Sequence, residues 1–189
     1  MPERLRNGVL ALGSLVFYLL GTWKRPWCLA LLLGLMALTW LSGRKLAGSK
    51  PLLVGNLLVL GLCLFGFKYA GLLGSGIALP LGLSFYSFQM AAYVIDVYRG
   101  DAAVQRDPLK LALYIAFFPQ LVAGPIVRYT TVAEEIDERH ESVSEFSAGA
   151  VRFLFGLGKK MLLANAVARI ADAAFAAVMP SVLFAWLGA

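Results

Sequence analysis

Residues 51–70 read PLLVGNLLVLGLCLFGFKYA, and this stretch decides the fold class. It carries no charged residue before Lys68. A helix of about 20 predominantly apolar residues is long enough to cross the roughly 30 Å hydrocarbon core of a bilayer. Pro51 suits the first turn of such a helix, where its missing N–H group would have no intrahelical partner. The stretch therefore predicts a membrane-spanning helix from Pro51 to Phe67–Tyr69.

Three further apolar stretches of similar length surround it. They predict helices from about Asn7 to Trp23, from Pro26 to Trp40–Gly43 and from Leu81 to Tyr98. Apolar residues make up 60% of the chain, well above the roughly 45–50% of soluble domains. We therefore predict an all-α, polytopic integral membrane protein with about five to six hydrophobic helices, some of them broken or re-entrant and some amphipathic at the interface. Residues 1–189 are predicted to form a single membrane domain.

The charged residues lie between the apolar stretches. The formal net charge is +6, but bases that flank hydrophobic helices indicate contact with the lipid bilayer and speak against nucleic-acid binding. With the N-terminus inside, eight bases fall in the inner loops 1–7, 43–50 and 99–110, and three fall outside. The positive-inside rule favours this orientation. The three outer bases are Lys24, Arg25 and Lys68. The two cysteines lie within apolar stretches and are predicted to be buried thiols with no disulfide or metal role.

The fourth predicted helix, Leu81–Tyr98, carries many polar side chains. Polar groups at membrane depth must face protein or water, so this helix is expected to face a protein interior. Asp96 and Arg99, three residues apart, are predicted to form a structural ion pair at the inner boundary, and a functional role is the alternative. The polar positions are Ser84, Tyr86, Ser87, Gln89, Tyr93 and Asp96.

Residues 108–125, PLKLALYIAFFPQLVAGP, predict a broken helix. Pro119 removes a hydrogen-bond donor inside the apolar stretch, and Gly124 with Pro125 ends it. Irregular backbone is tolerated in a membrane only where protein or water satisfies it. Because Gln120 and Arg128 lie beside the break, we favour the wall of a functional cavity over a simple kink.

Residues 130–145 predict a charged surface segment with a short helix, because six of the eleven acids fall in 134–145. Thr131 with Glu134, and Ser142 with Glu145, fit the capping box of a helix start. His140 lies among these charges and is predicted to be a solvated side chain, not a catalytic one.

The stretch Phe146–Met179 predicts an amphipathic helix, at the membrane interface or packed across the inner side, instead of a membrane span. Lys159 and Lys160 interrupt its apolar pattern. Three polar side chains share one face by their spacing, namely Asn165, Arg169 and Asp172.

Three ordered stretches resemble the signature sequences of the membrane-bound O-acyltransferase family, most of all the branch that O-acetylates alginate. They are LPLGLSFYSFQ at 79–89, YVIDVYRG at 93–100 and FFPQLVAGPIVR at 117–128. With the following stretch 152–165, the resemblance covers about residues 55–189. Residues 1–54 match the family in hydropathy more than in sequence.

The resemblance implies a fold whose broken helices line a tunnel through the bacterial inner membrane. It also implies an acyl thioester donor, acetyl-CoA or an acyl carrier, and periplasmic polysaccharide-acetylation partners. In the family, a tunnel histidine is expected to deprotonate the acceptor hydroxyl, a task that suits a pKa near neutrality. The residues that we expect to line the tunnel or hold the fold are Tyr86, Gln89, Asp96, Arg99, Gln120 and Arg128.

The sequence departs from the family in one important respect. The catalytic histidine of the family lies in tryptophan- and histidine-rich segments that this sequence lacks, and the single histidine, His140, is outside such a motif. The resemblance therefore implies the amino-terminal part of an O-acyltransferase, with no catalytic residue of its own, no metal and no activity alone.

Two other classes stay open on the sequence. A small helical transporter or channel subunit would use Gln89, Asp96 and Arg128 to line a path, because polar groups beside a broken helix also mark transport sites. A membrane anchor would dock a soluble partner through the acidic segment 130–145.

Overall fold

A computed structural model of the chain describes residues 3–46, 48–70, 78–122, 124–139, 142–176, 181–183 and 186. All the regular secondary structure within these residues is helical, as predicted. The chain divides into two compact units, Met1–Arg139 and His140–Ala189. His140 itself lies outside the described residues, so the prediction of a solvated side chain there remains a prediction.

The first three helices correspond to predicted ones. They are α1 (Glu3–Gly21), α2 (Trp27–Lys45) and α3 (Lys50–Ala70). By length and composition, α2 and α3 can each cross a membrane, and α1 supplies a shorter apolar helix. Pro51 lies in the first turn of α3, as expected, whereas Pro26 stands directly before α2 with a φ of −61°. The lack of an N–H group in proline is harmless at both positions.

The fourth helix, α4 (Leu83–Arg99), is bounded by two glycines in left-handed conformation. Gly82 has φ 72°, and a Cβ atom there would lie 2.6 Å from the backbone oxygen of Leu121. Gly100 has φ 81° and donates its N–H group to carbonyls of the last helical turn. Only glycine adopts positive φ at little cost, so these two residues fix where α4 begins and ends.

The predicted break after the fourth helix is confirmed. Residues 108–121 form two helices, α5 (Pro108–Ala116) and α6 (Phe118–Leu121), which are separated at Phe117. Asp107 caps α5, because its Oδ1 atom accepts a hydrogen bond of 2.9 Å from the backbone N–H of Leu109. The nine residues of α5 extend about 13 Å at 1.5 Å per residue, which is shorter than a bilayer core.

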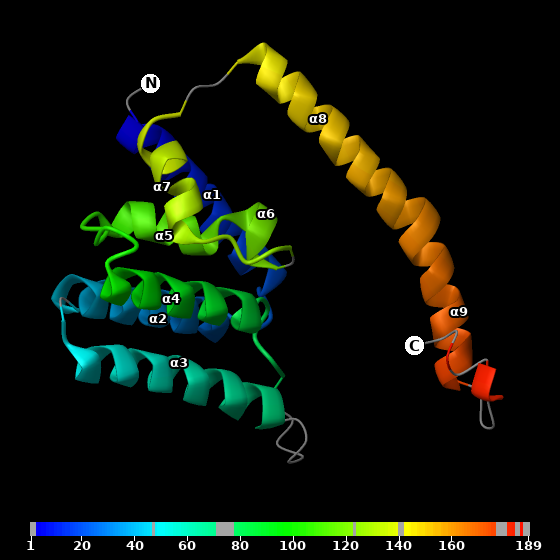
Figure 1. The fold of residues 1–189 in the computed structure, drawn as a ribbon, viewed down its shortest axis with the longest axis horizontal. Helices are drawn as coiled ribbons and strands as arrows, with labels where there is room; N and C mark the ends of the chain where they lie inside the picture. Colours follow the sequence, from blue (N-terminus) through cyan, green and yellow to red (C-terminus); the bar gives the residue numbers. More distant parts are fainter. Residues whose placement is uncertain are drawn as a thin grey trace. The chain divides into compact units, whose positions relative to one another are not determined.

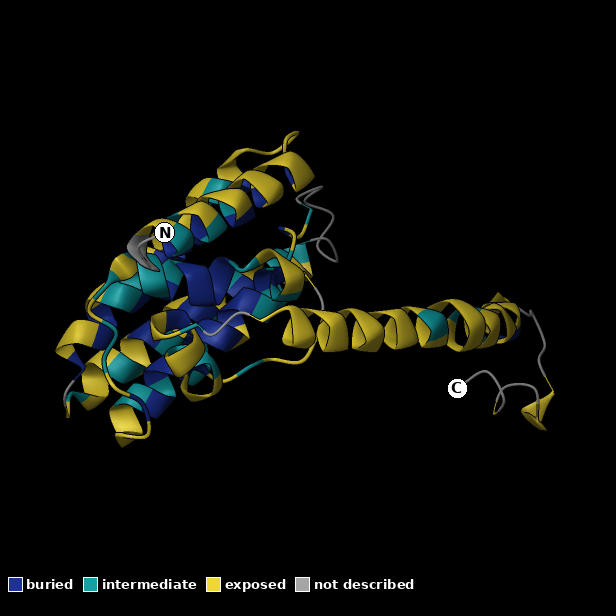
Figure 2. Ribbon diagram, turned by 90° about the horizontal axis from the view of Figure 1, so that it is seen from above, coloured by how far each residue is buried: buried dark blue, intermediate teal, exposed yellow. Residues whose placement is uncertain are grey.

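The helices of the first unit pack in layers around α4 and α5. Figure 1 shows α3 on one side, α2 and α4 in the middle, and α5 with α6 on the other side, where α1 crosses them. Buried positions gather in this middle region, whereas much of α3 is exposed (Figure 2). The largest fully buried side chains include Tyr18, Tyr86, Tyr93 and Tyr114. The core of the bundle is therefore rich in tyrosine, whose hydroxyl groups need partners when buried.

One of the two predicted capping boxes is wrong. The helix α7 (Tyr129–Asp137) begins after Arg128, so Thr131 lies inside it and caps nothing. The prediction failed because the Thr131–Glu134 spacing also fits the first turns of a helix that has already begun. Ser142 does cap the following helix: its Oγ atom accepts a 3.1 Å hydrogen bond from the N–H of Glu145 and donates a 3.0 Å bond to that carboxylate.

The second unit contains one long helical run. It consists of α8 (Val143–Gly158), a π-helical segment (Lys159–Ala164) and α9 (Asn165–Ala176). The paired lysines that interrupt the apolar pattern open the π-helical segment. Residues 177–179 of the predicted amphipathic helix lie outside the described residues. Ala174 is the one buried residue among the described positions of this helical run. Almost all the other side chains of the run are exposed.

Candidate functional site

The break between α5 and α6 changes the hydrogen bonding of the backbone. In a continuous helix, the N–H of Phe118 would donate to the carbonyl of Tyr114, four residues earlier. Here that N–H lies 3.3 Å from the Oγ atom of Ser14 on α1, which accepts it. The same hydroxyl of Ser14 donates a 2.7 Å bond to the carbonyl of Leu10. A side chain of α1 thus replaces the missing helical partner of Phe118.

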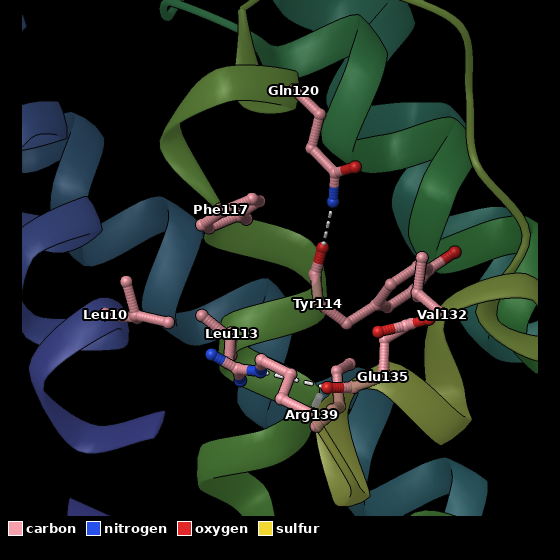
Figure 3. A pocket seen from close by; sticks show the side chains of 9 residues that line it. Leu10, Leu113, Tyr114, Phe117, Gln120, Val132, Glu135 and Arg139 are labelled. Carbon is pink, nitrogen blue, oxygen red and sulfur yellow. Dashed lines mark hydrogen bonds between the residues drawn. The ribbon is translucent and has the colours of Figure 1, made fainter. Parts of the chain in front are cut away.

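Two glutamine side chains bind the carbonyl oxygen that the break releases. Gln89 of α4 and Gln120 of α6 each donate from Nε2 to the backbone oxygen of Tyr114, both at 2.8 Å. Figure 3 shows the bond from Gln120. A backbone carbonyl has two lone pairs, so both are used. The two bonds join α4, α5 and α6 at one atom.

Three tyrosine rings, one of them that of Tyr114 itself, pack together beside the last turn of α5. The ring of Tyr129 meets those of Tyr93 and Tyr114 edge to face, with centroid distances of 5.2 and 5.3 Å. The Tyr114 hydroxyl donates to the carbonyl of Val127 at 2.8 Å. Gln105 donates its backbone N–H to the oxygen of Tyr93 at 3.0 Å and its amide to that of Tyr129 at 2.6 Å. Burial raises the pKa of Tyr129 while the bond from Gln105 lowers it, with burial the larger cause.

Buried polar atoms on α4 lack partners among the described residues. These atoms are the hydroxyl of Tyr86, the Oγ of Ser87 and the Oδ2 of Asp96. Asp96 is 2% exposed, whereas Arg99 is exposed and forms no ion pair with it in the described part of the chain. The predicted Asp96–Arg99 pair is therefore wrong. A spacing of three permits contact on a helix, but Asp96 is directed into the core and Arg99 outward.

A cavity of about 230 Å³ opens between α1, α5 and α7. Leucine, valine, isoleucine and phenylalanine side chains form most of its wall, and Gln120, Glu135 and Arg139 add polar groups (Figure 3). Arg139 donates from Nε to the carbonyl of Glu135 at 2.9 Å and from Nη2 to the Oδ1 of Asn7. Asn7 in turn donates to the carbonyl of Ile136 at 3.0 Å. These bonds fasten the end of α7 to the first helix.

The six predicted site residues do not form one cluster. Gln89 and Gln120 meet at the Tyr114 carbonyl, and Gln120 also lines the cavity. Tyr86 and Asp96 are buried, whereas Arg99 and Arg128 are exposed at helix ends. Their role as lining of a tunnel remains a prediction.

Sequence reasoning missed several residues that organise the site. They are Asn7, Ser14, Gln105, Tyr114, Tyr129 and Arg139. The signal that could have found some of them was the break itself, because a broken helix releases carbonyl and N–H groups that need partners. Asn7 and Arg139 lie 132 positions apart, so no local pattern relates them.

The residues around the helix break fix its geometry and offer neutral hydrogen-bond donors. Among the described residues, no three histidine, cysteine or carboxylate side chains gather as metal ligands do. The groups around the Tyr114 carbonyl are amides and phenols, which do not take up protons near neutral pH. The site can fix the geometry of a cavity, whereas proton transfer from a hydroxyl requires a base of suitable pKa.

All the described secondary structure is helical, and two of its helices are long and apolar enough to cross a membrane. By sequence, the chain is similar over almost its whole length to members of the membrane-bound O-acyltransferase family. It is similar to the probable alginate O-acetylase of Pseudomonas syringae, with 35% identity over 213 residues, 99% of this chain and 40% of the relative. The corresponding protein of Pseudomonas fluorescens is 37% identical over 196 residues, 99% of this chain and 39% of the relative.

A more distant relative is named for a different activity. The peptidoglycan O-acetyltransferase of Helicobacter pylori is 28% identical over 225 residues, 94% of this chain and 42% of the relative. The chain thus spans about two fifths of the length of the curated relatives that it matches. No family model matches the chain, and no solved structure does.

Proposed function

We propose that the chain is the amino-terminal part of a membrane-bound O-acyltransferase that transfers an acetyl group to polysaccharide hydroxyls. The observation that carries the proposal is the match over 99% of the chain to probable alginate O-acetylases. The peptidoglycan O-acetyltransferase supports the same reaction class on another polysaccharide. The common element in these names is acetyl transfer to a sugar hydroxyl.

The proposed setting is the bacterial inner membrane, crossed several times. Two helices with the length and composition of membrane spans support insertion. The proposal extends this to about five to six hydrophobic helices with the N-terminus inside, because bases concentrate in the loops assigned to that side. The acyl donor would be a thioester, acetyl-CoA or an acyl carrier, and periplasmic polysaccharide-acetylation proteins would be partners.

The contribution of this part would be structural. The bonds of Gln89 and Gln120 to one carbonyl, and the bond of Ser14 to Phe118, hold the break in one geometry. A rigid wall of this kind is what a tunnel needs to position two reactants. The base would come from another part of the enzyme, because the sequence holds one histidine outside any family motif. The 189 residues alone would therefore be inactive.

The test compares the chain alone with the chain supplied together with the rest of an O-acetylase. The chain is produced in bacterial membranes alone, or together with the remaining segment of an alginate O-acetylase, in cells that lack their own enzyme. Labelled acetyl groups in the polysaccharide are then measured. We expect incorporation only with the second segment. Robust incorporation by the chain alone would refute the claim of inactivity, and the absence of incorporation with several complementary segments would count against the acyltransferase role.

The alternative of a small transporter or channel rests on polar residues lining a common path. Gln89 and Asp96 are buried in the bundle while Arg128 is exposed, an arrangement that gives this alternative less support.

In a full-length relative, replacing the residue equivalent to Arg128 by alanine should reduce acetyl transfer through lost charge or geometry at the cytoplasmic mouth. Unchanged transfer at equal expression would contradict the assigned role.

A further inference from the structure

A second hollow lies at the opposite end of the bundle from the charged loops. It is a groove of about 470 Å³ between the α1–α2 turn and the segment before α4. Lys24 and Arg25 supply its charged groups, and Thr22 and Pro80 are among its other lining residues. We call it the Lys24–Arg25 groove. The turn is ordered, because the N–H of Arg25 donates to the carbonyl of Thr22 at 2.7 Å.

The two bases of this groove lack acidic partners. Both side chains are exposed, and neither forms a hydrogen bond or ion pair with the described residues. The sequence contains no aspartate or glutamate between Arg4 and Ile95, so the four helices that meet at this end bring no acid to it. The N-terminus of α2 follows directly, and its dipole adds partial positive charge. The positive charge of the groove is therefore suited to binding an anion.

The surroundings of the groove are those of a membrane interface. Trp23 lines it and is 72% exposed. Trp27 stacks on Phe67 of α3, with centroids 5.5 Å apart and planes 19° from parallel, which brings Lys68 to the same end. Tryptophans beside bases at the ends of apolar helices are typical of the headgroup layer. Below the groove, α2 and α3 expose apolar side chains that can lie against acyl chains.

We propose that the Lys24–Arg25 groove binds the phosphate of an anionic phospholipid such as phosphatidylglycerol. The ammonium and guanidinium groups would donate charge-assisted hydrogen bonds to the phosphate oxygens, and Trp23 would lie at the level of the headgroup. A soluble polyanion shares the charge chemistry. The lipid is favoured because the groove continues into exposed apolar helix surfaces, which a polysaccharide would not cover. The proposal is independent of the acyltransferase function.

The experiment measures lipid preference in bilayers. The chain is reconstituted in phosphatidylcholine with a minor fraction of brominated phosphatidylglycerol, or of brominated phosphatidylcholine, and quenching of tryptophan fluorescence is titrated. The double variant Lys24→Gln/Arg25→Gln removes the two bases. The matched control Lys45→Gln/Lys50→Gln removes two exposed charges at the other end of α2 and α3. Each basic side chain near a surface contributes about 1 kcal/mol toward anionic lipid, so the groove variant should lose roughly tenfold to thirtyfold in preference.

Each outcome decides for or against the site. Loss in the groove variant with retention in the control supports it, as does retention in the charge-preserving variant Lys24→Arg/Arg25→Lys. Equal loss in both neutral variants would show attraction by net charge alone and overturn the proposal. No loss in the groove variant would overturn it as well. Displacement of brominated phosphatidylglycerol by a soluble polyuronate would assign the groove to a polysaccharide instead. Circular dichroism confirms that all variants remain helical.

Discussion

The close approach of α6 to the start of α4 makes a quantitative prediction. A Cβ atom at Gly82 would lie 2.6 Å from the oxygen of Leu121, whereas one at Gly100 would meet nothing within 4 Å. Both glycines have positive φ, 72° and 81°. Replacing either by alanine costs about 1–2 kcal/mol in the left-handed region, offset by about 0.4–1 kcal/mol because the unfolded chain loses entropy.

The two substitutions should therefore differ by the cost of the clash. Gly100→Ala is expected to lower the free energy of unfolding by roughly 0.5–1 kcal/mol after that offset. Gly82→Ala adds strain of about 1–3 kcal/mol, since backbone must move, and should lower it by roughly 2–4 kcal/mol. Gly61→Ala, in the interior of α3 with open space around it, should be stabilising by about 1 kcal/mol.

Unfolding can be followed through a buried thiol. Cys28 is 2% exposed, so its reaction with a maleimide in mixed micelles of rising denaturing-detergent content reports opening of the bundle. Cys63→Ser removes the second thiol. Equal destabilisation by Gly82→Ala and Gly100→Ala would refute the close approach and leave only the backbone cost. A stable Gly82→Ala protein would refute the left-handed conformation at that position as well.

Other features of the structure give three further predictions. Gln89→Leu and Gln120→Leu should each lower the free energy of unfolding by about 1 kcal/mol. The double variant should lower it by more than the sum, since the Tyr114 carbonyl then loses both donors. The maleimide assay on Cys28 measures both single variants and the double variant. Ser142→Ala should lower the helix content of a 140–176 peptide in micelles through loss of a cap worth about 1 kcal/mol, whereas Thr131→Ala should barely alter unfolding of the full chain. Arg139→Ala should lower the free energy of unfolding by about 1.5–3 kcal/mol, because the bonds to Glu135 and Asn7 are lost. It should also speed hydrogen exchange in α7.

The helices were predictable because the signals for them are local. The stretch 51–70 is apolar over the length of a membrane span, and α3 occupies it within one residue of the predicted start. The break at Phe117 was predictable from Pro119, which cannot donate a hydrogen bond. Each of these signals, a proline, a glycine or an apolar run, acts on a few neighbouring residues. The helix boundaries in the structure follow them.

The polar contacts were not predictable because they depend on packing between distant helices. Whether Asp96 turns toward Arg99 or into the core is decided by the helices around α4, which a spacing of three cannot report. The bond from Phe118 to Ser14 spans 104 positions. The identity of the partner for a released backbone group depends on which helix crosses the break, and this is a property of the fold.

The π-helical segment Lys159–Ala164 has a consequence for sequence change in the second unit. A π turn closes its hydrogen bonds over five residues instead of four, so it accommodates one additional residue within an α-helix. Each residue of an α-helix advances the direction of side chains by about 100°. The orientation of the polar face with Asn165, Arg169 and Asp172 relative to α8 is therefore set by that residue. Deletion of one residue here would turn the whole of α9 by about 100°, a larger effect than substituting any side chain on it.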